Sequence, residues 1–156
     1  ENDPADFLYI VVEGLVEMYA TNAGRETTIG FVKPIGTFIL AAVLKDQVYL
    51  QSARTLEKSR VLMIPSENVR DSMHRDTAFM TAIVLELATC YRNLVKDLKN
   101  QKLRTGTERL ANWLSRTNRA DGGTGTVELT VVTQVLASRV AMPPDTLSSA
   151  VAALVP

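Results

Sequence analysis

Apolar residues recur at alternating steps of four and three along residues 76–103, a stretch that contains neither proline nor glycine. This spacing predicts one continuous helix with a coiled-coil seam along one face. At a rise of about 1.5 Å per residue the helix would be roughly 40 Å long, which exceeds the width of a small domain. The residues of this predicted seam are Met80, Val84, Leu87, Tyr91, Leu94 and Leu98.

A second apolar stripe lies beside the seam and consists of Phe79, Ile83, Cys90 and Val95. One stripe would face the helix's own domain, and the other would face a second copy of the chain. The charged residues of this stretch avoid the seam, which favours a dimerisation helix. The alternative is a long core helix in a monomer.

Before the helix, short apolar and β-branched runs alternate with turn-forming residues. The runs cover residues 7–14, 15–20, 27–32, 38–44, 48–55 and 59–64. Strands that are this short and regularly spaced predict an antiparallel barrel or jelly roll. The first run begins close to residue 1, so we expect further strands upstream of it.

After the helix, the pattern changes to short helical segments. Thr105 and Glu108 form a capping box at the start of a helix that reaches residue 119. Residues 127–130 are predicted as a short strand, and Thr130 as the cap of a helix over 131–141. A further helix begins near Pro144, in the position that proline favours. Two short helices joined by a four-residue break suggest a helix-turn-helix, although an ordinary helical hairpin has the same pattern.

Composition narrows the possible functions. Lys and Arg number 17 and Asp and Glu number 17, so the chain lacks the basic excess of nonspecific nucleic-acid binders. The single cysteine, Cys90, cannot form an intrachain disulfide or a four-cysteine zinc or iron–sulfur site, and fits a reducing cytosol. No signal peptide is visible, and no apolar run approaches the ~18 residues of a membrane span.

The order of these segments resembles the bacterial regulators typified by the catabolite activator protein and the fumarate–nitrate reduction regulator. The similar stretches are residues 7–14 (FLYIVVEG), 24–26 (GRE), 108–114 (ERLANWL), 136–139 (LASR) and 145–148 (DTLS). The resemblance implies an α+β fold with an antiparallel β-roll like that of cyclic nucleotide-binding domains, a dimerisation helix and a winged helix-turn-helix lacking most of its wing. It divides the chain at residues 1–75, 76–103 and 104–156. The family also has residues before Glu1 and after the last helix, so we expect a chain truncated at both ends.

The resemblance also implies an effector pocket. Its residues would be Phe38, Leu40, Ala41, Gln51, Ser52 and Leu94. Ala41 and Gln51 stand where the cyclic-nucleotide members carry a glutamate for the ribose and an arginine for the phosphate. Leu94 and Val95 stand where hydroxyls would meet the adenine. A phosphate without its cation loses a charge-assisted contact of about 1.5–3 kcal/mol. These departures argue against cAMP as the effector.

Residues 38–44 are apolar, as expected of a plain barrel core or of a pocket for an apolar ligand or haem. Haem needs an axial ligand, for which His74 and Cys90 are the candidates. The simpler interpretation makes His74 a surface residue at the end of a helix and Cys90 a small residue of the core. The alternative for Cys90 is a thiol that senses oxidation. We find no nucleophile–base pair, phosphate loop or metal-ligand cluster, so no catalytic or metal residues are predicted.

At the DNA-binding end, the resemblance assigns contacts to Arg139, Asp145, Thr146, Ser148 and Ser149. Asp145 and Ser149 stand where the family has glutamate and arginine, so the bidentate guanine contact, worth about 1–3 kcal/mol, is lost. Ala141 occupies the usual glycine of the turn, where a Cβ at positive φ costs about 1 kcal/mol.

We therefore predict a cytoplasmic, homodimeric, DNA-binding transcription regulator controlled allosterically by an effector other than cAMP. RNA polymerase is expected as a partner from the family resemblance, and no membrane contact is expected. The alternative is a dimeric haem or small-ligand sensor with a weak or vestigial DNA-binding end. A monomeric jelly-roll enzyme is the third hypothesis.

Overall fold

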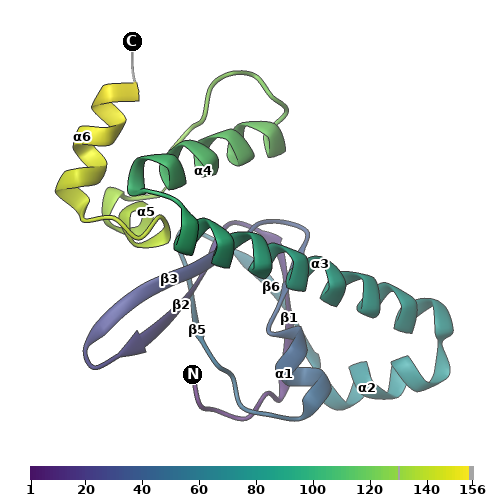
Figure 1. Ribbon diagram of the computed structural model, residues 1–156. Coiled ribbons are helices and arrows are strands. Elements are labelled where there is room, and N and C mark those ends of the chain that lie inside the picture. Colours follow the sequence, from purple (N-terminus) through teal and green to yellow (C-terminus); the bar gives the residue numbers. More distant parts are fainter. Residues whose placement is uncertain (130, 155–156) are drawn as a thin grey trace. The chain divides into compact units, whose positions relative to one another are not determined.

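The computed structural model describes residues 1–129 and 131–154 (Figure 1). The chain forms two compact units, one of residues 1–93 and one beginning at Leu94. Helix α3 (Thr77–Leu103) contributes its first part to one unit and its last part to the other. Each unit has its own hydrophobic core, and the two are described in turn.

The first unit contains the predicted antiparallel β-roll. Its strands are β1 (Phe7–Glu13), β2 (Val16–Asn22), β3 (Arg25–Val32), β4 (Gly36–Phe38), β5 (Ser52–Thr55) and β6 (Arg60–Pro65). They form two three-stranded sheets with the orders β4-β1-β6 and β3-β2-β5, and every pairing is antiparallel. Val11 and Phe38 from one sheet share a buried cluster with Val16 and Met18 from the other. This shared core holds the two sheets together.

The connection between β1 and β2 depends on a glycine. Gly14 has φ +90, in the region that side chains disfavour. A Cβ at this position would lie 2.2 Å from Oγ of Ser59. Any larger residue would therefore meet both backbone strain and a steric clash at this turn.

The predicted strand over residues 38–44 was wrong. Only β4 is extended there, and helix α1 (Leu40–Lys45) follows it. Leu40 and Val43 are buried, whereas Ala41 between them is exposed, which is the spacing of a helix face. A short apolar run does not by itself distinguish a buried strand from a buried helix. The predicted strand over 48–55 is also shorter in the structure, where β5 covers only its last four residues.

Helices close one side of the β-roll. Helix α2 (Ser66–Arg75) and the start of α3 pack with α1 and β1 around a second buried cluster. From α3 this cluster takes Ile83, which is buried, with Phe79 and Leu87 at its edge. The stripe beside the seam thus packs partly on the helix's own domain, and so does the seam residue Leu87.

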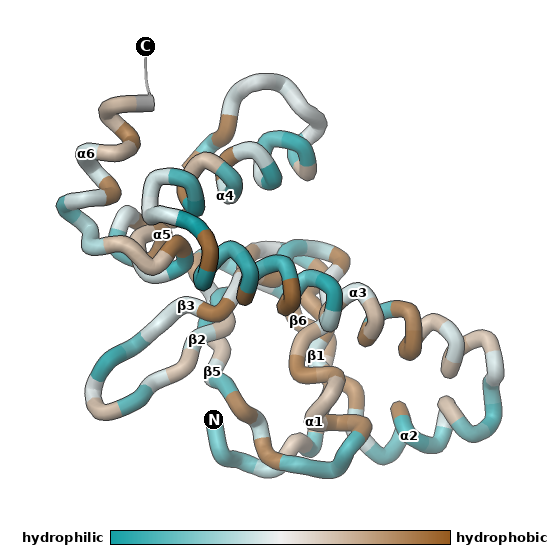
Figure 2. The backbone as a smooth tube through the Cα atoms, in the orientation of Figure 1, coloured by the Kyte–Doolittle hydropathy of each residue, from teal (hydrophilic) through white to brown (hydrophobic). Residues whose placement is uncertain are grey.

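Helix α3 is continuous over 27 residues, as the periodicity predicts. Asp76 caps its start, because its Oδ1 accepts hydrogen bonds from the backbone N–H groups of Ala78 and Phe79. Figure 2 shows hydrophobic positions recurring along this helix. The seam residues other than Leu87 are between 40% and 69% exposed, namely Met80, Val84, Tyr91, Leu94 and Leu98.

Contrary to the expectation from sequence, α3 is long and apolar enough to cross a membrane. It alone passes this criterion within the described residues, and core helices of soluble proteins pass it too. The apolar residues of this helix include the exposed seam residues, whose spacing is that of a coiled-coil interface.

The second unit contains α4 (Gly106–Ala120), α5 (Thr133–Arg139) and α6 (Pro144–Leu154). The predicted capping box at the start of α4 is confirmed, since Thr105 and Glu108 bond each other's backbone N–H groups. A common buried core contains one leucine from each of these helices: Leu110, Leu136 and Leu147. Residues 127–129 do not form the predicted strand, and the predicted cap Thr130 lies outside the described residues.

Candidate functional site

The β-roll contains a cavity of about 470 Å³ that residues from both sheets line. Three of the predicted pocket residues lie on its wall: Phe38, Gln51 and Ser52. Leu40 and Ala41 do not line it, because α1 turns the first into the core and the second outward. Leu94 belongs to the second unit, so its assignment to the pocket stays a prediction.

Arg54 is a charged residue of the cavity wall that the sequence did not single out. It lines the cavity, and its guanidinium binds two carboxylates. Nε donates to Oε2 of Glu17 over 2.7 Å, and Nη2 donates to Oε1 of Glu26 over 2.6 Å. The guanidinium also lies 4.4 Å from the ring centroid of Tyr19. Hydrogen bonds to Glu26 and Glu17 raise the pKa of Arg54 above its ordinary value.

Glu17 is the fully buried partner of this arrangement, with no exposed side-chain surface. Its second oxygen accepts a hydrogen bond from Oγ1 of Thr28 over 2.6 Å. A buried carboxylate is tolerated only when it is paired and hydrogen-bonded, which is what Arg54 and Thr28 provide. The guanidinium is therefore already committed to protein carboxylates at the cavity wall.

Gln51, unlike Arg54 and Glu17, has a side-chain atom without a hydrogen-bond partner. Its Oε1 atom is buried and has no hydrogen-bond partner within the described part of the chain. Buried side-chain acceptors are nearly always paired, so each exception asks for an explanation. Both residues line the cavity, but the guanidinium of Arg54 is paired with carboxylates and the unpaired Oε1 of Gln51 is buried from solvent.

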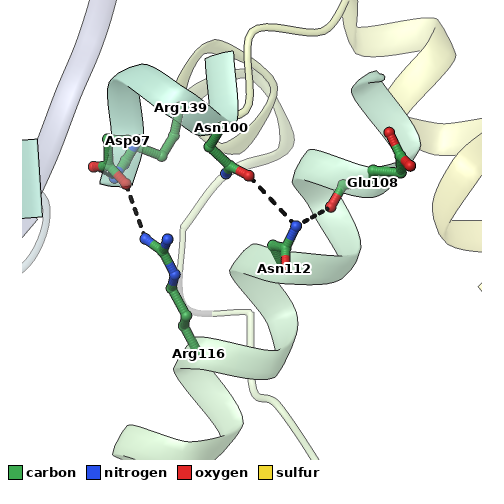
Figure 3. Close-up of polar contacts among 6 residues, drawn as sticks. All are labelled: Asp97, Asn100, Glu108, Asn112, Arg116 and Arg139. Atoms are coloured by element: carbon green, nitrogen blue, oxygen red, sulfur yellow. Dashed lines mark hydrogen bonds and ion pairs between the residues drawn. The ribbon is translucent and has the colours of Figure 1, made fainter. Parts of the chain in front are cut away.

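In the second unit, the predicted DNA contact Arg139 is held by a carboxylate from α3 (Figure 3). Its Nη2 donates to Oδ2 of Asp97 over 2.6 Å, while Nη1 of Arg116 donates to Oδ1 of the same residue over 2.9 Å. The Arg139 side chain is only 19% exposed. One carboxylate therefore links the end of α3 to both α4 and α5.

The remaining predicted DNA contacts share the outer face of α6. Asp145, Thr146, Ser148 and Ser149 are all exposed, whereas Leu147 and Ala150 turn into the core. The two serine hydroxyls donate to the backbone carbonyls of Pro144 and Asp145. The outer face of α6 therefore carries three hydroxyl groups and one carboxylate. These side chains are short, so the helix could approach a bound partner closely.

Arg109 on α4 fixes the turn between α5 and α6. Its Nε donates to the carbonyl of Val140 and its Nη2 to that of Ala141, each over 2.7 Å. A third bond runs from Nη1 to the carbonyl of Arg104 over 2.7 Å. Carbonyls at a helix end have no partner inside the helix, and Arg109 satisfies them. It is a positioning residue that local sequence patterns do not reveal.

Residues 1–76 match the sequence profile of the cyclic nucleotide-binding domain. This part of the chain belongs to that domain family.

Solved structures extend the likeness beyond the cyclic nucleotide-binding domain to almost the whole chain. FixK2 from Bradyrhizobium japonicum is 20% identical, with a TM-score of 0.89 over 99% of this chain and 77% of its own. A CRP-family transcriptional regulator from Thermus thermophilus is 21% identical, with a TM-score of 0.77 over 99% and 77%. The c-di-GMP-responsive regulator CLP of Xanthomonas campestris is 19% identical, with a TM-score of 0.78 over 98% and 79%.

The chain therefore shares the fold of these three proteins over almost its whole length. No curated protein sequence matches the chain.

The two candidate haem ligands lie away from the cavity of the cyclic nucleotide-binding domain. His74 is exposed near the end of α2, and neither it nor Cys90 lines the cavity. Cys90 is exposed, so the interpretation as a small core residue was wrong. Partial desolvation and the neighbouring Glu86 raise the pKa of the Cys90 thiol, which disfavours the reactive thiolate. Across residues 1–129 and 131–154, no group of three or more metal-binding side chains is present.

Ala141→Gly is expected to stabilise the chain by about 0.5–1 kcal/mol, since Ala141 has φ 52 and glycine has no Cβ to strain there. Urea denaturation followed by circular dichroism measures this change. Ala111→Gly, at an exposed helical position of α4, is the matched control and is expected to destabilise by a similar amount. Equal signs for the two substitutions would contradict the assignment of strain to the turn.

Proposed function

We propose that the chain is a homodimeric, DNA-binding transcription regulator whose effector is not cAMP. The observation that carries this proposal is a single helix, α3, that runs from a cyclic nucleotide-binding domain to a helix-turn-helix. Residues 1–75 would act as the sensor, 76–103 as the dimerisation helix and 104–156 as the DNA-binding part. RNA polymerase as a partner and a cytoplasmic location belong to the same proposal.

The exposed seam of α3 supports the dimer. Five large apolar side chains in heptad spacing lie open along the helix: Met80, Val84, Tyr91, Leu94 and Leu98. A second copy of the helix would bury them in the manner of a coiled coil. Paired helix-turn-helix units would then meet two half-sites about 34 Å apart, one turn of the duplex.

The cavity wall supports an effector other than cAMP. Arg54 supplies the basic side chain of the lining, and its charge is balanced by Glu17 and Glu26. A cyclic phosphate entering this cavity would meet a guanidinium whose charge is already paired within the protein, and no other lysine or arginine lines the cavity among the described residues. An allosteric effect would arise if the bound effector favours one of two arrangements of α3.

Selection of duplexes from a random library with the full chain tests the proposal. We expect enrichment of a two-fold symmetric sequence with half-sites about one turn apart. Asp145→Ala combined with Ser149→Ala on the outer face of α6 should weaken binding by about tenfold or more, because each base contact is worth about 1–3 kcal/mol. Glu57→Ala, on the first unit, is the control and should change nothing. An unenriched library would contradict the DNA-binding role.

A sensor dimer with a weak DNA-binding end is the second candidate. It is favoured by the absence of lysine and arginine from residues 144–154 and by the engagement of Arg139 with Asp97. Haem as its ligand lacks support, because His74 and Cys90 both lie outside the cavity lining. The same selection separates the two candidates, since the sensor alone would enrich no sequence.

A further inference from the structure

The last turns of α3 are attached to the other helices of the second unit by polar side chains. Every residue from Leu94 to Leu103 is exposed except Asp97 and Asn100, which are half-buried. The buried core of this unit takes its residues from α4, α5, α6 and the turn between α5 and α6, and among the described residues none of it comes from α3. Hydrophobic packing therefore does not fix this end of α3, and its polar contacts carry that role.

Asp97 is the principal attachment between α3 and the helix-turn-helix (Figure 3). Its two carboxylate oxygens accept separate hydrogen bonds, one from Arg139 on α5 and one from Arg116 on α4. Asn100 adds a longer contact, because its Oδ1 accepts from Nδ2 of Asn112 over 3.4 Å. Charge-assisted bonds are stronger than bonds between two amides. The carboxylate therefore holds α4 and α5 to α3 more firmly than Asn100 does.

The same segment of α3 carries the end of the predicted dimer seam. Leu94 and Leu98 lie close to Asp97 in sequence, and both are exposed. At about 3.6 residues per turn, Asp97 and Asn100 lie about a quarter turn around the helix from the line of these two leucines. In a dimer one face of this segment would meet the partner helix, while the neighbouring face holds α4 and α5 of its own chain. The orientation of each helix-turn-helix relative to the dimer axis would then depend on Asp97.

A fixed orientation restricts the DNA that a dimer can bind. Moving a half-site by one base pair shifts it by about 3.4 Å along the duplex and rotates it by about 35°. Two rigidly held helix-turn-helix units cannot follow this change. Joint binding of two half-sites is lost when the geometry forbids their simultaneous contact.

We propose that Asp97 is a positioning residue that fixes the helix-turn-helix to the dimerisation helix and so restricts the spacing of the half-sites. This inference rests on the proposed homodimeric, DNA-binding function. It adds a determinant of DNA specificity that touches no base. In this arrangement Arg139 positions α5 and is not required for the contact between α6 and a half-site.

Selection from the random duplex library with the full-length wild type and Asp97→Asn in parallel tests the proposal. The wild type should favour one spacing at least about tenfold over spacings one base pair longer or shorter, whereas in Asp97→Asn this preference should fall below about threefold. Both proteins should enrich the same half-site. Circular dichroism should show a folded variant, since the buried core of the second unit does not involve Asp97.

Glu128→Gln is the matched control, because it removes an exposed carboxylate from the same unit. It should keep the single spacing of the wild type. In a gel shift with a duplex that has one half-site, Asp97→Asn should bind as Glu128→Gln does. A single retained spacing in Asp97→Asn overturns the proposal. A gain of half-site affinity over the control also overturns it, because the carboxylate would then mask a DNA contact.

Arg139→Gln separates positioning from direct contact with DNA. It should broaden the accepted spacing as Asp97→Asn does and retain affinity for the single half-site. A loss of half-site affinity by about tenfold or more, which is the expected cost of a lost base contact, overturns the positioning role. A wild-type library without enrichment would overturn the proposed function itself, and this result is distinct from a variant that keeps the spacing of the wild type.

Discussion

Replacing Arg54 with glutamine is expected to lower the free energy of unfolding by about 2–3 kcal/mol. The substitution leaves the carboxylate of Glu17, which has no exposed side-chain surface, without its cation. Breaking a fully buried ion pair costs about 3–5 kcal/mol. We expect a smaller loss because the Arg54 side chain is 40% exposed and solvent screens the pair. Urea denaturation followed by circular dichroism measures the difference.

Arg60→Gln is the matched control for this prediction. Arg60 also pairs with a glutamate, Glu13, but the two side chains are 66% and 64% exposed. Exposed pairs of this kind contribute about 0–1 kcal/mol. The double variant Arg54→Gln, Glu17→Gln should recover much of the loss, since it leaves no unpaired buried charge. Equal effects of Arg54→Gln and Arg60→Gln would contradict the importance of burial.

Leu94→Glu is expected to raise the dissociation constant of the proposed dimer at least roughly 100-fold. Each copy would lose the burial of one leucine, worth about 1.5–3 kcal/mol, and the two-fold axis would bring two carboxylates close together. A loss of about 2.7 kcal/mol already corresponds to a factor of about 100. Sedimentation equilibrium without DNA or effector measures the constant.

Leu103→Glu provides the control on the same helix. Leu103 is at least as exposed as the seam residues, but lies at a heptad position facing away from the seam. It should leave the dimer unchanged. A chain that remains monomeric at micromolar concentration before any substitution would remove the dimer from the proposal, and the exposed seam would then need another explanation.

Local patterns predicted the features that depend on neighbours in sequence. The heptad spacing located α3 to within a residue of its observed start, and the capping box of Thr105 and Glu108 was readable from two side chains three positions apart. The strand predicted over residues 38–44 was wrong because a run of seven apolar residues suits a strand and a helix equally. Packing favours the helix, because Leu40 and Val43 lie on one helical face and both enter the buried core.

Features that depend on pairing between distant segments could not be predicted. Glu17 and Arg54 are opposite each other because β2 pairs with β5 in one register, and sequence alone does not specify that register. Alignment to the family drew attention to Gln51 as the phosphate residue and missed Arg54 three positions later. The family resemblance assigned Arg139 to DNA, and nothing in its sequence neighbourhood indicated its ion pair with Asp97, 42 positions away.

The carboxylate of Asp97 bears on how DNA binding would respond to salt. Binding of DNA is driven largely by the release of counterions. Each phosphate that a lysine or arginine neutralises releases the counterions condensed on it. Arg116 and Arg139 already share their charge with Asp97, and α6 contributes no cation. A duplex held by α5 and α6 would therefore displace few condensed ions. Its affinity would vary gently over salt concentrations at which strongly basic DNA-binding proteins lose several orders of magnitude.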